Sequence, residues 1–270
     1  MADTALPQGV AVITGAAGGM GSACARQLAE AGWNRLLLCD VSAERLEAVA
    51  EPLRAAGNAV SVLAGDIADP GFPAKVVYAL KGEPISALIH TAGIAPMNQE
   101  PLRILAVNLD ATIGLVEAVR DQMAPGSAAV LFASNSSYFP MPPEAAAVFT
   151  QPMPEGGAVS LVHLTPAPEV AYPLSKLGVR ALVKREAKAF GARGVRLVSL
   201  SPGAIDTPMT QGAQVSGPLA ERMILGSAIG RMGQADEVAA VAVFLCSPAA
   251  RFVTGVDWLV DGGQTTAMGF

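Results

Sequence analysis

A tyrosine and a lysine separated by about one helical turn are the first candidates for chemistry. Tyr172 and Lys176 stand four residues apart in a segment that predicts a helix, so both side chains lie on one helical face. A free tyrosine has a pKa of about 10, too high for a base near neutral pH, and a nearby ammonium lowers it by stabilising the phenolate. The pair can therefore act as general acid and base, although surface pairs without a chemical role often have the same spacing.

A glycine-rich turn is the second candidate. Residues 14–21 are Thr-Gly-Ala-Ala-Gly-Gly-Met-Gly and lie between a predicted strand and a predicted helix. A backbone without side chains can approach a pyrophosphate at the N-terminus of that helix. The alternative is that these glycines only allow close packing between the strand and the helix.

Asp40 favours the nucleotide interpretation of that turn. It ends the second predicted strand, nineteen residues after Gly21, where a carboxylate can accept hydrogen bonds from ribose hydroxyls and repels a 2′-phosphate. Neither the turn nor the residues just after Asp40 include an arginine or lysine, so NAD is predicted rather than NADP. An N-cap role for Asp40 is the alternative, although Ser42 can fill that role itself.

The elements that must position these residues alternate regularly along the chain. The sequence predicts a doubly wound, Rossmann-type α/β fold with a parallel sheet, in one domain spanning 1–270. Strands are predicted over 10–14, 36–39, 59–64, 87–90, 129–133, 195–200 and 257–260, and helices over 22–31, 43–55, 102–122, 172–190 and 236–245.

Composition excludes several partner classes. Of 270 residues, 51% are apolar and 15% charged, and the net charge of −5 includes no basic block, which argues against nucleic acid or an anionic membrane surface as partner. The start of the chain lacks a signal-peptide pattern and no apolar run is long enough to span a membrane, so a cytoplasmic protein with a small-molecule substrate is expected. The three widely spaced cysteines predict core packing and neither a metal site nor a disulfide framework.

Further motifs follow the glycine turn in an order that resembles the classical short-chain dehydrogenase/reductase family. They cover nearly the whole chain. They are Asn108, Ser134, Tyr172-Pro-Leu-Ser-Lys176, Ser201-Pro-Gly-Ala-Ile-Asp-Thr207, and the closing segments 230–239 and 254–263. The resemblance implies an oxidoreductase that transfers hydride between NAD(H) and a secondary alcohol or ketone.

The resemblance also implies residue roles. Tyr172 would donate and accept the proton, Ser134 would bind the substrate oxygen, and Asn108 would hold a water in a proton relay. Lys176 would bind the nicotinamide ribose and lower the tyrosine pKa. Ser136 and Ser137 also follow the fifth strand, so Ser134 is chosen by its place at the strand end. The cofactor-binding residues so implied are Gly15, Gly18, Gly19, Met20, Gly21, Asp40, Asp66, Ile67, Ala92, Gly93, Asn108, Tyr172, Lys176, Pro202, Gly203, Ile205 and Thr207.

Two features depart from the common family pattern. His90 stands where the family often has asparagine, and a structural role is expected for it. Ser134 and Tyr172 are thirty-eight residues apart, with a proline-rich segment over 138–170 between them. This predicted insertion resembles that of some bacterial hydroxysteroid dehydrogenase/carbonyl reductases, which makes a steroid or bulky cyclic ketone a candidate substrate. Six of its side chains would line a substrate wall, or would instead pack the segment onto the body or form a subunit contact. They are Tyr138, Phe139, Met141, Phe149, Met153 and His163.

Other expectations concern the substrate lid, the assembly and rival functions. A lid is predicted over 208–229, and a homodimer or homotetramer is expected, with its helix-mediated interface altered by the insertion. The rivals are other chemistry on the same fold, such as enoyl reduction or sugar-nucleotide epimerisation, and an NAD-binding sensor or scaffold without turnover. The intact Asn108, Ser134, Tyr172 and Lys176 set favours the dehydrogenase.

Overall fold

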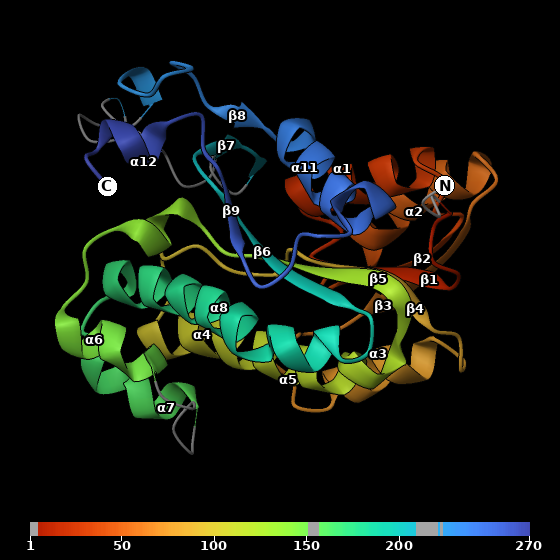
Figure 1. Ribbon diagram of the computed structural model, residues 1–270, viewed down its shortest axis with the longest axis horizontal. Helices are drawn as coiled ribbons and strands as arrows, with labels where there is room; N and C mark the ends of the chain where they lie inside the picture. The colour runs from red at the N-terminus through yellow and green to blue at the C-terminus, as the bar shows by residue number, and fades with distance from the viewer. Residues whose placement is uncertain (1–4, 151–156, 209–220, 222–223) are drawn as a thin grey trace.

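Seven parallel strands form the central sheet of the computed structural model, which describes residues 5–150, 157–208, 221 and 224–270 (Figure 1). They lie in the order β3-β2-β1-β4-β5-β6-β9, and each neighbouring pair is parallel. Their bounds are β1 Val10–Thr14, β2 Arg35–Asp40, β3 Ala59–Ala64, β4 Ile85–His90, β5 Met123–Phe132, β6 Arg196–Pro202 and β9 Asp257–Val260. The doubly wound fold expected from the sequence is confirmed.

Helices cover both faces of this sheet (Figure 1). In β1, Ala11 and Ile13 join a core cluster that includes α1 and α11, whereas Val12 joins a second cluster with α3, α5 and α8. Successive strand side chains point to opposite faces, so continuous apolar strands supply two cores. The longer helices are α1 Gly19–Glu30, α2 Ala43–Ala55, α3 Phe72–Ala79, α5 Ala111–Val119, α8 Pro168–Gly191 and α11 Ala235–Cys246, and the short ones are α4 Pro101–Leu105, α6 Pro143–Ala147, α7 Ala158–Leu161 and α12 Gln264–Ala267.

The strand order reverses beside β1, and this places the ligand-binding edge. The chain runs outward from β1 to β2 and β3, then returns to β4 on the other side of β1. In open parallel sheets, ligands bind outside the carboxyl ends of strands at such a switch point. The glycine turn after β1 and the end of β4 therefore lie at the same opening.

Two helix predictions need correction. Helix α3 was not predicted, because it is short and begins with Phe72 and Pro73, and proline is typical of a first helical turn as well as of loops. The single helix predicted over 102–122 is instead four consecutive pieces. Between α4 and α5 lies a π-helix, η1 (Ala106–Asp110), and α5 ends in a 3₁₀ turn, η2 (Arg120–Gln122).

The proline-rich segment between β5 and α8 folds into short turns that pack on the body. It begins with the 3₁₀ turn η3 (Asn135–Tyr138) and continues through α6, η4 (Val148–Thr150), α7 and η5 (Val162–Leu164). Met141 and Phe149 pack against a buried cluster with members on α4, η1, α6, α7 and α8: Leu105, Leu109, Ala145, Leu161 and Leu174. For these two side chains the packing alternative holds. Met153 and residues 209–220 and 222–223 of the predicted lid lie outside the described residues.

The cysteines behave as predicted. Cys24, Cys39 and Cys246 are free and buried, and burial raises the pKa of the Cys39 and Cys246 thiols to about 12. These thiols therefore stay protonated and pack as small apolar side chains. In the part of the chain that the structure describes, no three His, Cys, Asp or Glu side chains are grouped to hold a metal ion.

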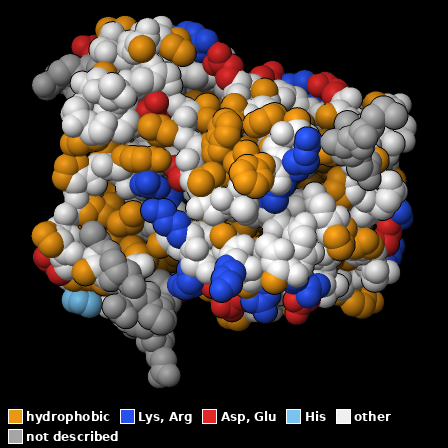
Figure 2. Space-filling view, in the orientation of Figure 1, with side chains coloured by type: hydrophobic (Ala, Val, Ile, Leu, Met, Phe, Trp, Pro, Cys, Tyr) orange, Lys and Arg blue, Asp and Glu red, His pale blue; other side chains and the backbone are white. Residues whose placement is uncertain are grey.

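Large apolar side chains are exposed beside the last strand. Figure 2 shows hydrophobic side chains gathered near α11 and β9, where Phe252 is 100% exposed and Phe244, Val256 and Leu259 are partly exposed. β9 is also an edge strand of the sheet, and such patches often mark contact surfaces. None of the described helices has the length and apolar character needed to cross a membrane.

Candidate active site

The predicted catalytic side chains come together at the carboxyl end of β5. Ser134 follows β5 by two residues, and Tyr172 and Lys176 lie in the first turns of α8. The Lys176 Nζ donates a hydrogen bond of 3.0 Å to the carbonyl of Phe132, the last residue of β5. It lies 5.9 Å from the centre of the Tyr172 ring. The ammonium thus fixes the start of α8 against the strand that carries Ser134.

Ser134 is the serine that faces the tyrosine. Burial raises the pKa of the Tyr172 phenol above its ordinary value, and the neighbouring Ser134 hydroxyl acts in the opposite direction by favouring the phenolate. Ser134 Oγ also accepts hydrogen bonds from Ser136 N at 3.2 Å and Ser136 Oγ at 3.0 Å. A hydroxyl oxygen has two acceptor sites, so the Ser134 proton is left to point at Tyr172 or at a substrate oxygen.

Lys176 is a buried cation with a shifted pKa. Lys176 is only 5% exposed, and burial lowers the pKa of its ammonium from 10.5 to about 8. A Cβ on Gly93 would lie 3.3 Å from Lys176 Nζ and 3.1 Å from Asn108 Oδ1. Gly93 therefore brings the cofactor-side loop against both residues. The predicted lowering of the Tyr172 pKa by Lys176 stays a prediction, since the lowering contribution found is that of Ser134.

Asn108 closes the loop after β4 with its side chain. Its Oδ1 accepts from Ile94 N at 2.8 Å, and its Nδ2 donates to Ile94 O at 3.0 Å and to Ser175 Oγ at 3.3 Å. It lies in η1, and π-helical turns inside helices are frequent at functional sites. Because its amide bonds to both backbone groups of Ile94, Asn108 fixes the loop after β4 beside Lys176, and its predicted water-holding role stays a prediction.

A cleft of about 490 Å³ lies along the glycine turn and reaches Gly93, beside Lys176 and Asn108. Eleven of the predicted cofactor-binding residues line it: Gly15, Gly18, Gly19, Met20, Gly21, Asp40, Asp66, Ile67, Ala92, Gly93 and Thr207. The others do not. Pro202 and Ile205 are buried, and Gly203 is packed so closely that a Cβ there would lie 2.3 Å from Gln264 Oε1.

The chemistry of this cleft fits a dinucleotide. Helix α1 begins at Gly19, and neither a side-chain cap nor an acidic residue in its first turn satisfies its N-terminus, so its N–H groups can receive an anion. Gly15 has a φ of +68°, and a Cβ on Gly21 would lie 2.1 Å from Gly15 O. The glycines therefore also meet the packing requirement, and both interpretations of the turn hold at once.

Asp40 is held at the edge of this cleft by backbone donors. Its Oδ2 accepts from Ala17 N at 3.1 Å, and its Oδ1 from Val41 N at 2.8 Å and Ser42 N at 3.4 Å. Ser42 itself caps α2 through Arg45 N. Asp40 is thus tied to the glycine turn and its own strand end, and it is not the N-cap of α2.

Two cleft arginines were missed from the sequence. Arg45 Nη2 donates to Ala17 O at 2.5 Å, and Arg103 Nη2 pairs with Asp66 Oδ2 at 2.6 Å. Burial raises the pKa of the Asp66 carboxyl, but hydrogen bonds from Ala68 N and Arg103 outweigh it and leave that pKa below its ordinary value. Arg45 lies five residues after Asp40, one turn into α2, where a search beyond the residues next to Asp40 could have found it.

His90 takes the structural role that was expected. Its Nδ1 lies 2.7 Å from Thr14 Oγ1 and its Nε2 lies 2.8 Å from Thr112 Oγ1. Thr112 Oγ1 donates to Asn108 O, so it accepts from His90, whose proton is therefore on Nε2. Burial lowers the pKa of His90 to about 3, and the charge of Lys176 acts in the same direction. The imidazole is a neutral brace between β1, β4 and α5.

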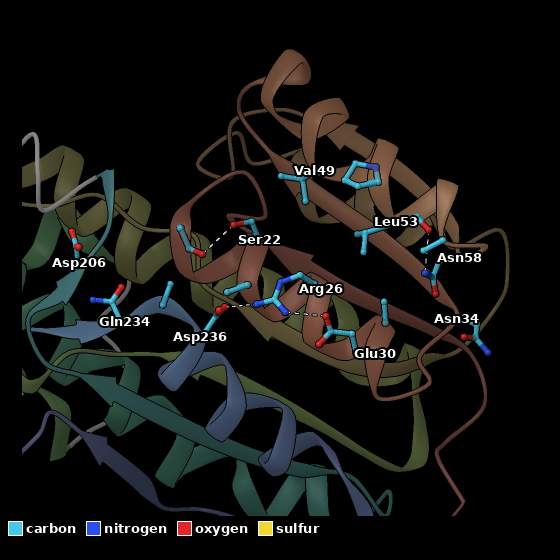
Figure 3. A pocket seen from close by; sticks show the side chains of 16 residues that line it. Ser22, Arg26, Glu30, Asn34, Val49, Leu53, Asn58, Asp206, Gln234 and Asp236 are labelled. Atoms are coloured by element: carbon cyan, nitrogen blue, oxygen red, sulfur yellow. Dashed lines mark hydrogen bonds and ion pairs between the residues drawn. The ribbon is translucent and has the colours of Figure 1, made fainter.

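A larger hollow of about 790 Å³ lies elsewhere, between α1, α2 and the start of α11. Arg26 pairs there with Glu30 at 2.9 Å and Asp236 at 2.5 Å (Figure 3). Of the predicted cofactor-binding residues, Gly19 alone is among the described residues that line it. Its described lining has three acidic residues and a single arginine, which does not suit an anionic dinucleotide, and the catalytic candidates lie elsewhere, so we place the site in the smaller cleft.

Family models match both halves of the chain. Residues 9–147 match a model described as short chain dehydrogenase, and residues 157–265 match one described as Enoyl-(Acyl carrier protein) reductase. Among solved structures, a short-chain dehydrogenase/reductase described as glucose/ribitol dehydrogenase from Brucella melitensis superposes with a TM-score of 0.77. It is 25% identical, and the match covers 96% of this chain and 97% of that one.

Several curated relatives are dehydrogenases of polyols and ring alcohols. D-threitol dehydrogenase of Mycolicibacterium smegmatis is 34% identical, with 95% of this chain and 92% of the relative covered. Cis-4-hydroxycyclohexanecarboxylate dehydrogenase of Sinomonas cyclohexanicum is 33% identical, with 97% and 98% covered. Galactitol 2-dehydrogenase (L-tagatose-forming) of Cereibacter sphaeroides is 32% identical, with 94% of each covered.

Proposed function

The chain belongs to the short-chain dehydrogenase/reductase family, and from that premise we propose that it is an NAD(H)-dependent dehydrogenase of cyclic or polyhydroxylated secondary alcohols. Hydride transfer between a nicotinamide cofactor and a secondary alcohol or ketone is the activity that its dehydrogenase relatives share. The cofactor preference, the substrate class and the residue roles are our proposal.

The observation that carries the proposal is the placement of the Ser134 hydroxyl beside the Tyr172 phenol, whose ring centre lies 5.9 Å from the buried ammonium of Lys176. Proton transfer by a positioned side chain accelerates such reactions by about 10²- to 10⁴-fold. A sensor or scaffold has no need for these three groups to lie together beside the loop that borders a cofactor cleft.

The roles of the chain's residues follow from this geometry. A bound nicotinamide cofactor supplies or accepts the hydride at the substrate carbon. The Tyr172 phenol donates its proton to the ketone oxygen during reduction, and the Tyr172 phenolate takes the alcohol proton during oxidation. The Ser134 hydroxyl, with its lone pairs occupied by Ser136, donates to the substrate oxygen and stabilises the charge that develops there. Lys176, protonated below its pKa of about 8, supplies a positive charge next to the phenol.

Asp40 supports NAD as the cofactor. Its carboxylate lines the cleft with its two oxygens tied to backbone N–H groups, so a 2′-phosphate placed beside it meets a fixed negative charge. Arg45 lines the same cleft and is occupied by the Ala17 carbonyl. We therefore expect a preference for NAD and not an absolute exclusion of NADP.

The substrate class rests on the relatives. The names of three of them specify a tetritol, a hexitol and a substituted cyclohexanol, and a hydroxysteroid is a larger ring alcohol of the same kind. The packing of Met141 and Phe149 into the body removes two side chains from the predicted substrate wall. We therefore rank small ring alcohols and polyols ahead of steroids.

The test is a substrate panel with the purified protein. Tetritols, hexitols, cyclohexanols and hydroxysteroids are incubated with NAD⁺ or NADP⁺ while the reduced cofactor is followed by absorbance. We expect turnover on at least one ring alcohol or polyol, with kcat/KM for NAD⁺ at least about tenfold above that for NADP⁺. Absence of turnover on every alcohol, and on the matching ketones with reduced cofactor, contradicts the proposal.

An oligomer is also proposed. The exposed Phe252 and Leu259 beside the edge strand β9 provide an apolar contact surface, whereas part of the α4 and α8 surface is covered by the segment between η3 and α8. Light scattering at micromolar concentration should give a mass of at least two chains. A monomer there contradicts this expectation.

A further inference from the structure

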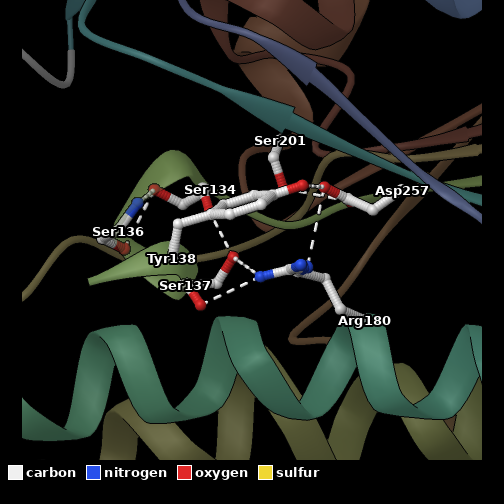
Figure 4. Close-up of polar contacts among 7 residues, drawn as sticks. All are labelled: Ser134, Ser136, Ser137, Tyr138, Arg180, Ser201 and Asp257. Carbon is white, nitrogen blue, oxygen red and sulfur yellow. Dashed lines mark hydrogen bonds and ion pairs between the residues drawn. The ribbon is translucent and has the colours of Figure 1, made fainter. Parts of the chain in front are cut away.

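A buried ion pair links α8 to β9 outside the predicted catalytic set. Arg180 lies one turn beyond Lys176 and two turns beyond Tyr172 on α8, and its Nε is 3.6 Å from Asp257 Oδ2 (Figure 4). The side chains are 16% and 5% exposed, respectively. Removing two charges from water is costly unless other hydrogen bonds compensate, so the partners of this pair show what it holds.

Asp257 accepts hydrogen bonds from two hydroxyl groups that lie on different elements. Tyr138 OH donates to its Oδ2 at 2.7 Å and Ser201 Oγ donates to its Oδ1 at 3.0 Å. Burial and the hydrogen bond to Asp257 raise the pKa of Tyr138 to about 12, which keeps this phenol a donor. Tyr138 ends η3, and Ser201 is the penultimate residue of β6.

Arg180 contacts the η3 turn as well, through Ser137 and Tyr138. Its Nη1 donates to Ser137 O at 2.9 Å and Ser137 Oγ at 3.2 Å, and its guanidinium carbon lies 3.7 Å from the centre of the Tyr138 ring. Its Nε is buried with no hydrogen-bond acceptor among the described residues, so the Asp257 charge compensates it. Arg180 and Asp257 therefore clamp Ser137 and Tyr138 between them.

The clamped turn carries Ser134. Ser137 Oγ donates to Ser134 O at 2.6 Å, and Ser134 Oγ caps η3 by accepting from Ser136 N. A shift of Ser137 or Tyr138 therefore moves the backbone on which the Ser134 hydroxyl is oriented. Because Arg180 and Tyr172 lie on the same helix, the clamp sets the two hydroxyl groups relative to each other.

We propose that Arg180 and Asp257 are positioning residues that fix the η3 turn, and with it the Ser134 hydroxyl, against Tyr172. This inference rests on the proposed function, since it assigns a task to the site that performs the oxidation. Neither residue touches the reacting atoms, so their removal should lower kcat with little change in cofactor binding. A displacement of about 1 Å at a catalytic group can cost about 100-fold in rate.

The test compares two buried arginines. Arg180→Lys keeps the charge and loses the planar fork that reaches Ser137 and Asp257 together. Arg196→Lys is the matched control, because Arg196 is also buried but donates to the carbonyls of Leu245, Cys246 and Ser247, away from η3. Each variant is assayed well below its unfolding midpoint, with kcat, KM for alcohol and Kd for NAD⁺ measured.

We expect Arg180→Lys to lower kcat by about 10- to 100-fold, with Kd for NAD⁺ within about threefold of the wild type. Arg196→Lys should keep kcat within about twofold. Tyr138→Phe, which removes one of the bonds to Asp257, should give a smaller loss of about three- to tenfold in kcat. A wild-type kcat in Arg180→Lys, or equal losses in the two arginine variants, overturns the proposal.

A second readout does not need a substrate. The ¹³C chemical shift of the Tyr172 phenol carbon reports the surroundings of the phenol, including the neighbouring Ser134 hydroxyl. Its signal is assigned with Tyr172→Phe among the three tyrosines of the chain. That shift should change in Arg180→Lys and not in Arg196→Lys, even if no alcohol turns over and the proposed function fails. An unchanged shift overturns the positioning role. If Arg180→Lys does not fold, Asp257→Asn is measured with the expectations given for Arg180→Lys, and Tyr138→Phe with its own smaller expected loss.

Discussion

The cofactor side and the catalytic side of the opening hold their charges in different ways. Along the cofactor cleft, Asp40 is fixed by backbone N–H groups and the Asp66–Arg103 pair is nearly half exposed. On the catalytic side, Lys176 and Asp257 are almost completely buried. Solvent screens exposed charges, whereas a buried charge that loses its partner keeps its full desolvation cost. Substitutions on the cofactor side should therefore change the affinity for the cofactor, whereas substitutions on the catalytic side should abolish most of the turnover.

Apart from the Tyr172 variant described last, the largest loss of kcat is expected for a substitution of Ser134. Ser134→Ala removes the proton that points at the substrate oxygen, and kcat should fall by about 100- to 1000-fold while Kd for NAD⁺ stays unchanged. Ser136→Ala is the matched control, because Ser136 Oγ bonds only to Ser134 among the contacts found for that hydroxyl in the described residues. Its loss in kcat should be at least tenfold smaller. Equal losses would contradict the assignment of Ser134.

The next change tests the cofactor side. Asp40→Asn removes the negative charge and keeps an oxygen that can accept from the Ala17 or Val41 N–H. The ratio of kcat/KM for NAD⁺ to that for NADP⁺ should fall by about tenfold or more, mainly through KM. Adding Arg45→Ala to Asp40→Asn should restore part of the ratio by removing the nearby cation. An unchanged ratio in Asp40→Asn would refute the role given to the carboxylate.

The buried brace at His90 sharpens the comparison through stability. Its pKa is about 3 in the folded chain and about 6.5 unfolded, so between these values the unfolded chain takes up a proton that the folded chain does not. Acid therefore favours unfolding, and this group should reduce stability by about 1.4 kcal/mol per pH unit as pH falls from 6.5 toward 3. His90→Gln can bond both threonines without titrating. Urea unfolding from pH 7 to 4 should show a shallower loss for this variant, and identical slopes would contradict the neutral histidine.

The smallest effect should come from the exposed pair of the cofactor cleft. Arg103→Ala removes a salt bridge whose side chains are 46% and 44% exposed, and such pairs contribute about 1 kcal/mol or less. KM for NAD⁺ should rise less than about fivefold, with kcat unchanged. A large fall in kcat would show that Arg103 does more than border the cleft.

The sequence was sufficient for residues whose partners are close in the chain or whose motif is self-contained. Tyr172 with Lys176, the glycine turn and Asp40 each depend on local spacing, and strands β3 and β9 and helix α2 have the predicted bounds because turn residues delimit them. The sequence favours Ser134 over Ser136 and Ser137 only by its place at the strand end, because the folded turn is needed to show which hydroxyl accepts from Ser136 and lies beside Tyr172.

The contacts that sequence reasoning missed join distant residues. Tyr138 and Asp257 are 119 positions apart, and Asp66 and Arg103 are 37 apart. Their spacing has no periodicity, so no pattern in one sequence indicates that they meet. The packing of Phe149 and Met141 could not be predicted from the sequence either. An apolar side chain suits a substrate pocket as well as the buried cluster of α4 and α8. Tertiary placement decides between these outcomes.

The most direct test of the account is Tyr172→Phe under single-turnover conditions, with alcohol added to the enzyme–NAD⁺ complex. The phenylalanine ring keeps the packing and removes the acid–base group, so the hydride-transfer rate should fall by about 100- to 10,000-fold while NAD⁺ binding is preserved. A rate within about threefold of the wild type would contradict the account, because the proton would then be moved by a group other than Tyr172.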